Sequence, residues 1–173
     1  MLSTRYPQTK ACTGLYSRPK MYPMPHLHRF HIPAPPEGQH LSLPPEEAHH
    51  ALRVVRIQEG DPVALFDGRG REWTGRVARC TRREVEVAVE SVREVPPPSP
   101  ALTLAVGRPN LDKSMEFIVR HGTELGVARF VFFHGARSQK PPKHNEKWNR
   151  LAIECCKQSG RLWLPEFHTA ESL

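Results

Sequence analysis

The sequence lacks the short motifs by which many cofactor-binding and hydrolytic proteins are recognised. It contains no Gly-x-Gly-x-x-Gly, no phosphate-binding P-loop, no Gly-x-Ser-x-Gly, no His-Glu-x-x-His and no EF-hand spacing. It also lacks an apolar run that approaches the roughly 18 residues needed to span a membrane. The generic nucleotide, hydrolase and zinc-protease patterns are therefore excluded, and we expect a soluble, cytoplasmic protein with no membrane partner.

Cysteine is scarce and not arranged for cross-linking. No two cysteines have Cys-x-x-Cys spacing, which argues against a disulfide framework and against a zinc knuckle. No carboxylate or cysteine accompanies the clustered histidines at ligand spacing, so we expect no metal. The cysteines are Cys12, Cys80, Cys155 and Cys156, and the clustered histidines are His26, His28 and His31.

Acidic residues are outnumbered: 18 Asp and Glu face 25 Lys and Arg, which gives a net charge of +7. Arginine leads the excess with 18 residues against 7 lysines, and guanidinium groups suit phosphate recognition. The excess is shared by the segments before and after Val95. Charge alone leaves two interpretations open, a nucleic-acid partner and an ordinary solvated arginine-rich surface.

The first 23 residues lack the apolar core of a signal peptide. They contain no acidic residue and carry Arg5, Lys10, Arg18 and Lys20, which would also fit a transit peptide. We favour a disordered leader, residues 1–23, upstream of a start at Met24.

Residues 24–95 have the pattern of a small β-rich domain. An apolar run, Val63 to Phe66, meets a turn at residues 67–70, which is a hairpin signal. Valines 85, 87 and 89 then alternate with polar or small residues, as in a strand with one buried face. We predict a small sheet or barrel.

A short helix is predicted before these strands, from Pro45 to about Val55. Proline is tolerated in its first turn, and Glu46 and Glu47 lie near the positive end of its dipole. Arg53 and Arg56, three residues apart, would share one helix face and could contact neighbouring phosphates, although a solvated helix end explains them equally well.

Residues 96–100, Pro-Pro-Pro-Ser-Pro, form an extended linker after which the pattern changes to α/β. Strands and helices alternate from there, which predicts right-handed crossovers and a parallel sheet. The predicted elements are a strand at 101–106, a helix capped by Asp112 and Gly126, a strand at 127–133, a helix capped by Asn145 and Gly160, and a strand at 162–167.

Candidate functional side chains lie at the ends of these elements, where α/β sheets bind ligands beyond the carboxyl ends of their strands. Each has a structural alternative: Glu124 as a surface acid, Ser159 as a packing residue and Arg161 as a cation that binds helix carbonyls. The candidates are Glu124, Arg137, Ser138, Gln158, Ser159 and Arg161.

Taken together, several segments resemble the RsmE-type 16S rRNA uridine N3-methyltransferases, of the SPOUT class of knotted methyltransferases. The resemblance covers Met24 to about Phe167. Its segments are Arg29-Phe30, residues 49–56 (HHALRVVR), Gly60-Asp61, residues 65–68 (LFDG), Met115-Glu116, residues 123–127 (TELGV), Arg137-Ser138, Trp148, residues 152–154 (AIE), residues 158–161 (QSGR) and Pro165-Glu166.

The resemblance implies an N-terminal PUA-like barrel that holds ribosomal RNA and a SPOUT-type α/β domain, residues 101–173, that binds S-adenosylmethionine and dimerises. It implies no metal. In such an enzyme the protein aligns the donor and helps to remove the uridine N3 proton, and Arg137, supported by Arg161 and Glu124, is the candidate that would stabilise the anionic uracil. RNA contacts are expected from Arg29, Arg53, Arg56, Arg137, Gln158 and Ser159.

Two departures from the family pattern qualify this expectation. Leu111-Asp112 replaces a Lys-Gly pair, and the glycine-rich Gly-Pro-Glu-Gly-Gly loop and a later Leu-Arg-x-Glu-Thr-Ala segment are missing. We therefore expect an incomplete methyltransferase domain that does not bind S-adenosylmethionine by itself. A non-catalytic rRNA-binding module and a fragment of a disrupted reading frame are the alternatives.

Overall fold

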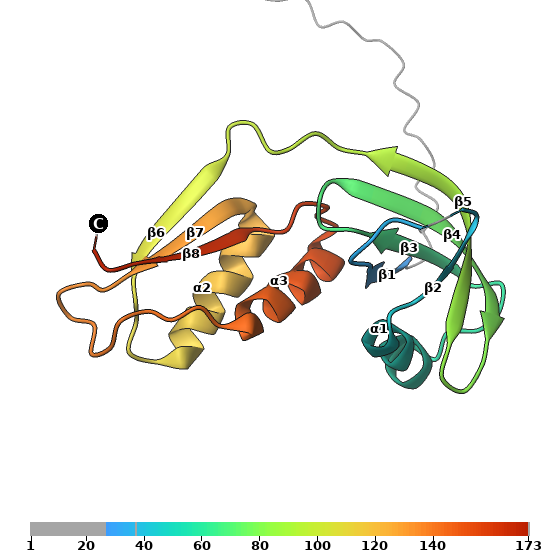
Figure 1. Ribbon diagram of the computed structural model, residues 1–173, viewed down its shortest axis with the longest axis horizontal. Helices are drawn as coiled ribbons and strands as arrows, with labels where there is room; N and C mark the ends of the chain where they lie inside the picture. Colours follow the sequence, from blue (N-terminus) through green and yellow to red (C-terminus); the bar gives the residue numbers. More distant parts are fainter. Residues whose placement is uncertain (1–26, 37, 173) are drawn as a thin grey trace, which may run out of the picture.

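A computed structural model describes residues 27–36 and 38–172 and organises them around two β-sheets (Figure 1). The predicted leader and His26 lie outside the described residues. The first sheet has five strands and the second has three, and the segment that follows β5 connects them.

The first sheet is mixed, in the order β1-β3-β4-β5-β2. β1 runs parallel to β3, whereas the other neighbours are antiparallel. The edge strands β1 and β2 form no ladder with each other among the described residues, so the PUA-like sheet is curved but not closed by hydrogen bonds. Its strands are β1 (His28–His31), β2 (His40–Ser42), β3 (Pro62–Phe66), β4 (Arg71–Cys80) and β5 (Val85–Glu94).

The predicted helix is α1 (Pro45–His50), continued by a π-helical turn (Ala51–Val55). Ala48 and Ala51 are buried in the same core as Phe30 and Leu65. The proline at the first helical position and the two acids of the first turn agree with the sequence argument. Strands β1 and β2 were not predicted, because they are only four and three residues long and prolines lie between them.

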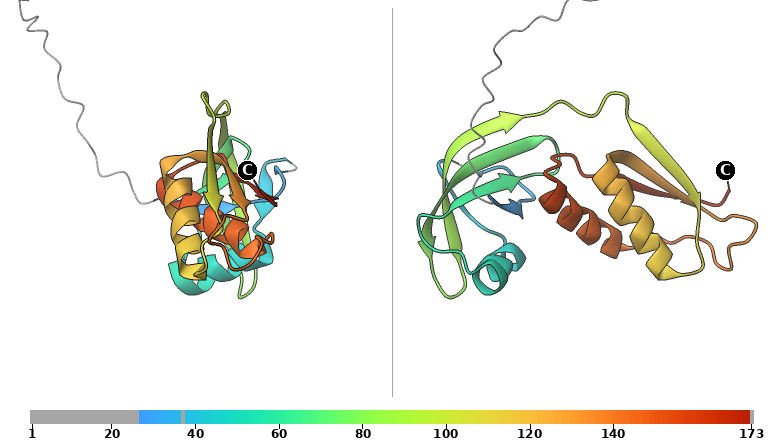
Figure 2. Two further views of the ribbon diagram at one scale, coloured as in Figure 1. Left: turned by 90° about the vertical axis from the view of Figure 1, so that its left-hand side faces the viewer. Right: turned by 180° about the vertical axis from the view of Figure 1, so that it is seen from behind.

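The second sheet is parallel, as predicted, in the order β6-β7-β8. Helices α2 and α3 lie on the same side of it (Figure 2), and their apolar faces cover Phe130 and Phe132 through Met115, Val119 and Trp148. The elements are β6 (Leu102–Gly107), α2 (Asp112–Leu125), β7 (Val127–Phe133), α3 (Glu146–Ser159) and β8 (Glu166–Ala170).

Three of the four predicted helix caps are confirmed. The Asn145 side chain accepts a hydrogen bond from the Lys147 N–H at 2.9 Å, and Gly126 and Gly160 end their helices in the left-handed conformation. Asp112 is wrong as a cap: it is the first residue of α2, the N-cap is Leu111, and no side chain caps the helix. The Asp112 carboxylate instead pairs with Arg108 at 3.6 Å.

The third predicted strand begins later than expected, at Glu166 rather than Leu162. Residues 162–164 lie instead against the turn between β3 and β4. The Gly70 N–H donates to the Leu162 carbonyl and the Leu164 N–H to the Gly68 carbonyl, both at 2.9 Å. Leu162 also packs with Phe66 and Cys156 in a third apolar cluster, so this segment joins the two halves of the molecule.

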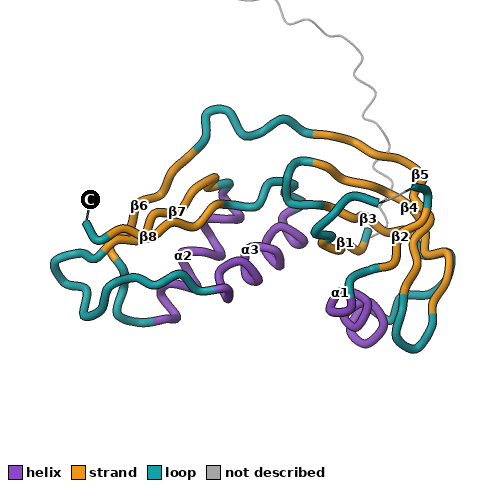
Figure 3. Tube along the Cα trace, in the orientation of Figure 1, coloured by secondary structure: helices purple, strands orange, loops and turns teal. Residues whose placement is uncertain are grey.

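A long irregular segment leads from β5 to β6 and a second one from β7 to α3 (Figure 3). The first contains the predicted proline linker, residues 96–100, and the domain limits at 24–95 and 101–173 stay a prediction. Within the described ranges, no helix is both long and apolar enough to cross a membrane.

Candidate nucleic-acid interface

The loops that follow β6 and β7 are tied to each other at the carboxyl edge of the parallel sheet. The Asn110 amide donates to the Arg137 carbonyl at 3.3 Å and accepts from the Gln139 N–H at 2.8 Å. The Ser138 hydroxyl donates to the Arg108 carbonyl at 2.7 Å. These bonds hold the chain at Arg137 and at the two residues after it, whereas the Arg137 side chain is exposed. Sequence reasoning found Arg137 and Ser138 but missed Asn110 and Arg108, which carry no motif.

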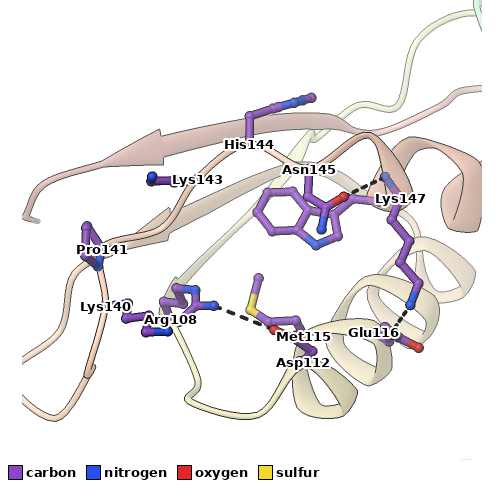
Figure 4. A pocket seen from close by; sticks show the side chains of 11 residues that line it. Arg108, Asp112, Met115, Glu116, Lys140, Pro141, Lys143, His144, Asn145 and Lys147 are labelled. Atoms are coloured by element: carbon purple, nitrogen blue, oxygen red, sulfur yellow. Dashed lines mark hydrogen bonds and ion pairs between the residues drawn. The ribbon is translucent and has the colours of Figure 1, made fainter.

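A cavity of about 530 Å³ lies beside these loops (Figure 4). Met115 and Trp148, both almost fully buried, contribute its apolar part. Its polar lining holds four cations and two carboxylates. The lining residues are Arg108, Asp112, Met115, Glu116, Lys140, Pro141, Lys143, His144, Asn145, Lys147 and Trp148.

Two of the four cations are already paired. Lys147 binds Glu116 at 2.6 Å, and Arg108 lies 3.6 Å from Asp112. Lys140 and Lys143 have no ion pair among the described residues, and both are exposed. With Arg137 they give this edge a positive excess, which suits the phosphates of a nucleic acid.

The other candidates of the second domain lie at the opposite edge of the sheet. Glu124 precedes β7 and Arg137 follows it, and a strand of seven residues is roughly 23 Å long. Gln158, Ser159 and Arg161 lie at the end of α3, also at the amino edge. Within one chain, therefore, Arg137 lies at the opposite edge of the sheet from Arg161 and Glu124, and the catalytic roles expected of the three stay predictions.

The contacts of Arg161 and Glu124 agree with the structural alternatives given for them, whereas Ser159 is exposed and forms a hydrogen bond instead of packing. The Arg161 Nε donates to the Glu124 carbonyl at 2.9 Å, so it binds the end of α2. The Glu124 carboxylate meets the His121 Nδ1 at 3.1 Å. The Ser159 hydroxyl donates to the Cys155 carbonyl at 2.7 Å. Their functional roles stay predictions.

Arg29, Gln158 and Ser159, three of the predicted RNA contacts, line one cavity of about 510 Å³ between β1 and the end of α3. Arg29 binds the Glu72 carboxylate through Nη1, and Arg93 binds the other oxygen of that carboxylate. This "interdomain cavity" brings together residues that are about 130 positions apart in the sequence.

The two arginines of the helical segment differ in conformation. Arg53 lines a small cavity with Arg82 and Arg83 from the turn between β4 and β5, a basic pair that the sequence argument passed over. Arg56 follows the π-helical turn with φ of 60°. The helical spacing that placed Arg53 and Arg56 on one face therefore does not extend to Arg56, although both are exposed.

The buried Cys156 does not have the lowered pKa that is typical of a nucleophilic thiol. Burial, and then the neighbouring Cys155, raise the pKa of the Cys156 thiol to about 12. Among residues 27–36 and 38–172, no three His, Cys, Asp or Glu side chains gather as a metal site would require.

Two family models match the sequence. The RNA methyltransferase PUA domain matches residues 43–90, and the RNA methyltransferase domain matches residues 96–173. The first match runs from just before α1 to the middle of β5 and leaves out the edge strands β1 and β2. The second begins at the proline linker and continues to the last residue.

Relatives with solved structures and curated names agree with these models. The ribosomal RNA small subunit methyltransferase E of Synechocystis is 34% identical over 130 residues, which are 72% of this chain and 41% of that protein. A probable rRNA-methyltransferase from Porphyromonas gingivalis superposes with a TM-score of 0.74 at 28% identity, over 84% of this chain and 61% of that one.

The methyltransferase E of Neisseria gonorrhoeae, solved bound to S-adenosyl methionine, gives a TM-score of 0.73 at 26% identity, over 83% of this chain and 62% of that one. The chain spans about half the length of the curated relatives it matches. Over its PUA segment and the part of the methyltransferase domain that it contains, the chain belongs to the family of the ribosomal RNA small subunit methyltransferases E.

Proposed function

We propose that the chain supplies the RNA-binding part of an S-adenosylmethionine-dependent methyltransferase that modifies a uridine N3 in 16S ribosomal RNA. The observation that carries the proposal is the carboxyl edge, where two loops tied by Asn110 and Ser138 carry the exposed Arg137, and where Lys140 and Lys143 line the cavity beside them. The matching relatives are named as methyltransferases of small-subunit ribosomal RNA, which supports this substrate.

Arg137 is the proposed catalytic residue. Methylation at N3 requires loss of the N3 proton, and a guanidinium beside the ring lowers the free energy of the resulting anion. Arg161 and Glu124 lie at the far edge of the same sheet, so in this proposal they would approach the same uridine only from a second copy. A homodimer is therefore part of the proposal.

The cavity at the carboxyl edge is a poor fit for S-adenosylmethionine. With a sulfonium, an ammonium and a carboxylate the methyl donor carries a net positive charge, whereas the cavity is lined by four cations and two carboxylates. This lining suits phosphate better than the methyl donor. That observation favours a second candidate function for the chain as it stands, a non-catalytic rRNA-binding module.

Fluorescence anisotropy with a labelled 16S rRNA fragment tests the RNA-binding part. We expect affinity to fall steeply between low and moderate salt. Arg137→Ala should weaken binding about tenfold and make the salt slope shallower by about 0.7 to 0.9. Arg120→Ala is the matched control, because Arg120 is an exposed arginine within α2 and not in the loops that follow β6 and β7. Equal losses of RNA affinity in the two variants would show that RNA does not bind specifically at the carboxyl edge.

Calorimetric titration with S-adenosylmethionine separates the two candidate functions. We expect RNA binding that is independent of the cofactor and no stoichiometric cofactor binding by the 173-residue chain. Tight cofactor binding would support catalysis by the chain itself and would disprove the poor fit argued from the cavity charges.

A further inference from the structure

We infer that the interdomain cavity between β1 and the end of α3 binds a phosphate ester through Arg29 and Gln158. The carboxyl edge is the site of the proposed function, and this cavity is a separate place in the fold. The inference rests on the proposed function only to the extent that RNA is the source of the phosphate.

Arg29 is held in a fixed orientation. Its Nη1 binds the Glu72 carboxylate, and its guanidinium lies 5.5 Å from the centre of the Phe66 ring. The side chain of Glu72 is 5% exposed and that of Arg29 is 15% exposed. A guanidinium anchored on two sides keeps its remaining donors in one direction.

Those remaining donors are unused. Arg29 Nε and Nη2 are buried and have no hydrogen-bond partner in the described part of the chain. They are the two nitrogens on the same side of the guanidinium, which together form the fork that binds two oxygens of a phosphate or carboxylate. Buried donors without acceptors are unfavourable, so an acceptor that enters from the cavity would be stabilised.

The free donors of Arg29, rather than a net positive charge, favour an anion as that acceptor. Glu72 is shared between Arg29 and Arg93, so this carboxylate does not use all the donors of either guanidinium. Lys157 and Glu154 also line the cavity, but Lys157 is bound to Glu47 and Glu154. Arg29 is therefore the cation with free donors at this place.

Further polar side chains surround the opening. Gln158 is exposed at the end of α3 and offers amide donors, whereas the Ser159 hydroxyl is already used in the bond to Cys155. His28 and His50 also line the cavity. One anchored guanidinium and a nearby amide, in a cavity whose other cation is already paired, suit a single phosphate group rather than a long polyanion track.

Nuclear magnetic resonance of the arginine side chains tests the inference on the full 173-residue chain. Inorganic phosphate, uridine 5′-monophosphate and a short single-stranded oligoribonucleotide are titrated separately. We expect the Nε–H signal of Arg29, identified by its loss in Arg29→Lys, to shift on titration. The Arg93 signal should change little, because Arg93 shares Glu72 but does not line the cavity.

The variants give the matching affinities. Arg29→Lys keeps the charge but removes the fork and should weaken binding about tenfold, since a charge-assisted pair is lost. Arg93→Lys should change affinity less than twofold. If Arg29→Lys does not fold, Gln158→Ala at an exposed position replaces it, with an expected loss of about threefold.

The three probes separate the outcomes. A response to the oligonucleotide alone assigns the site to the RNA backbone, and a response to all three probes assigns it to any phosphate ester. A response to phosphate without RNA binding anywhere would support this cavity and contradict the proposed function. If RNA moves the Arg137 signal and no probe moves that of Arg29, the inference is wrong.

Discussion

At the residue scale, Arg56 adopts a conformation that glycine would adopt at less cost. Its φ of 60° and ψ of 43° lie in the left-handed region, where a Cβ costs about 1 to 2 kcal/mol. Arg56→Gly should therefore raise the free energy of unfolding by about 0.5 to 1 kcal/mol, even after the entropy that glycine loses on folding. If Arg56 contacts RNA, the same change lowers RNA affinity.

Arg53→Gly is the matched control for this prediction. It removes the same charge from the right-handed π-helical turn, where glycine should lower stability by about 1 kcal/mol. Urea unfolding of the two variants should thus give opposite signs. A loss of stability in both would contradict strain at Arg56.

Gly122 is required for the contact between α2 and β7. A Cβ at this position would lie 2.6 Å from the ring of Phe130. That ring is fully buried and stacks on both Phe132 and Phe167, so it cannot easily move. Overpacking at Gly122→Ala should cost about 1 to 3 kcal/mol, against the roughly 1 kcal/mol that alanine gains in a helix, so we expect a net loss of stability of up to about 2 kcal/mol. A thermal melt at or above the wild-type temperature would contradict the close packing.

The residues of the candidate interface could be found from the sequence only where a motif marks them. Arg137 and Ser138 belong to a segment that resembles the family, so they were predicted. Asn110 acts through its side-chain amide and Arg108 through its backbone carbonyl. Contacts of this kind cannot be predicted from residue type or spacing. Arg29 was predicted as an RNA contact, but its partner Glu72 lies 43 positions away and could not be inferred.

At the element scale, the turn between β3 and β4 depends on Asp67. Its carboxylate accepts from the N–H groups of Arg69 and Arg71, at 2.8 and 3.1 Å, and from the Arg71 Nε at 2.8 Å. Burial opposes ionisation of this carboxyl, but these three donors prevail and lower the pKa of Asp67. Asp67→Asn places an amide opposite a donor and should lower stability by about 1 to 3 kcal/mol at pH 7.

The pH dependence of this loss has a definite sign. A lowered pKa gives stability that is present above the pKa of the unfolded carboxyl, about 3.9, and is lost as pH falls through the native value. The difference between wild type and Asp67→Asn should be constant from pH 7 to 5 and shrink below about pH 4. Urea unfolding across this range checks it, and a pH-independent difference would show that charge is not involved.

The same turn also binds a segment whose place in the fold could not be predicted from the sequence. The hairpin and three of four helix caps were predicted, because each depends on neighbours within a few residues, and the parallel sheet was predicted from the alternation of strands and helices. Residues 162–164 were assigned to the wrong strand, since an apolar run does not say which sheet it meets. Here it bonds to Gly68 and Gly70, nearly 100 positions away.

At the scale of the whole molecule, a buried ion pair joins the two halves. The Lys157 Nζ of α3 lies 2.6 Å from Glu47 of α1 and 2.8 Å from Glu154. The side chains of Lys157 and Glu47 are only 8% and 12% exposed. Removing one partner from a buried pair costs more than removing one from a surface pair, because a desolvated charge is left behind.

Lys157→Met should therefore lower the free energy of unfolding by about 3 kcal/mol at pH 7. Lys147→Met is the matched control: its pair with Glu116 is equally short at 2.6 Å, but the two side chains are 61% and 37% exposed, so a loss of at most about 1 kcal/mol is expected. Equal losses in the two variants would contradict the role given to burial.

The pH dependence and a double variant identify the charge responsible. Burial raises the pKa of Glu47, and the neighbouring Lys157 lowers it again in part. A carboxyl whose pKa is raised in the folded protein contributes stability below the pKa of the unfolded state, about 4.3, and this contribution is lost as pH rises. Lys157→Met removes the cation that lowers the Glu47 pKa, so the loss of stability in this variant should be small near pH 4 and full at pH 7.

Glu47→Gln combined with Lys157→Met should recover most of the loss at pH 7, because no unpaired charge then remains between α1 and α3. If the double variant is as unstable as Lys157→Met, the halves are joined through the packing of the lysine chain rather than through its charge.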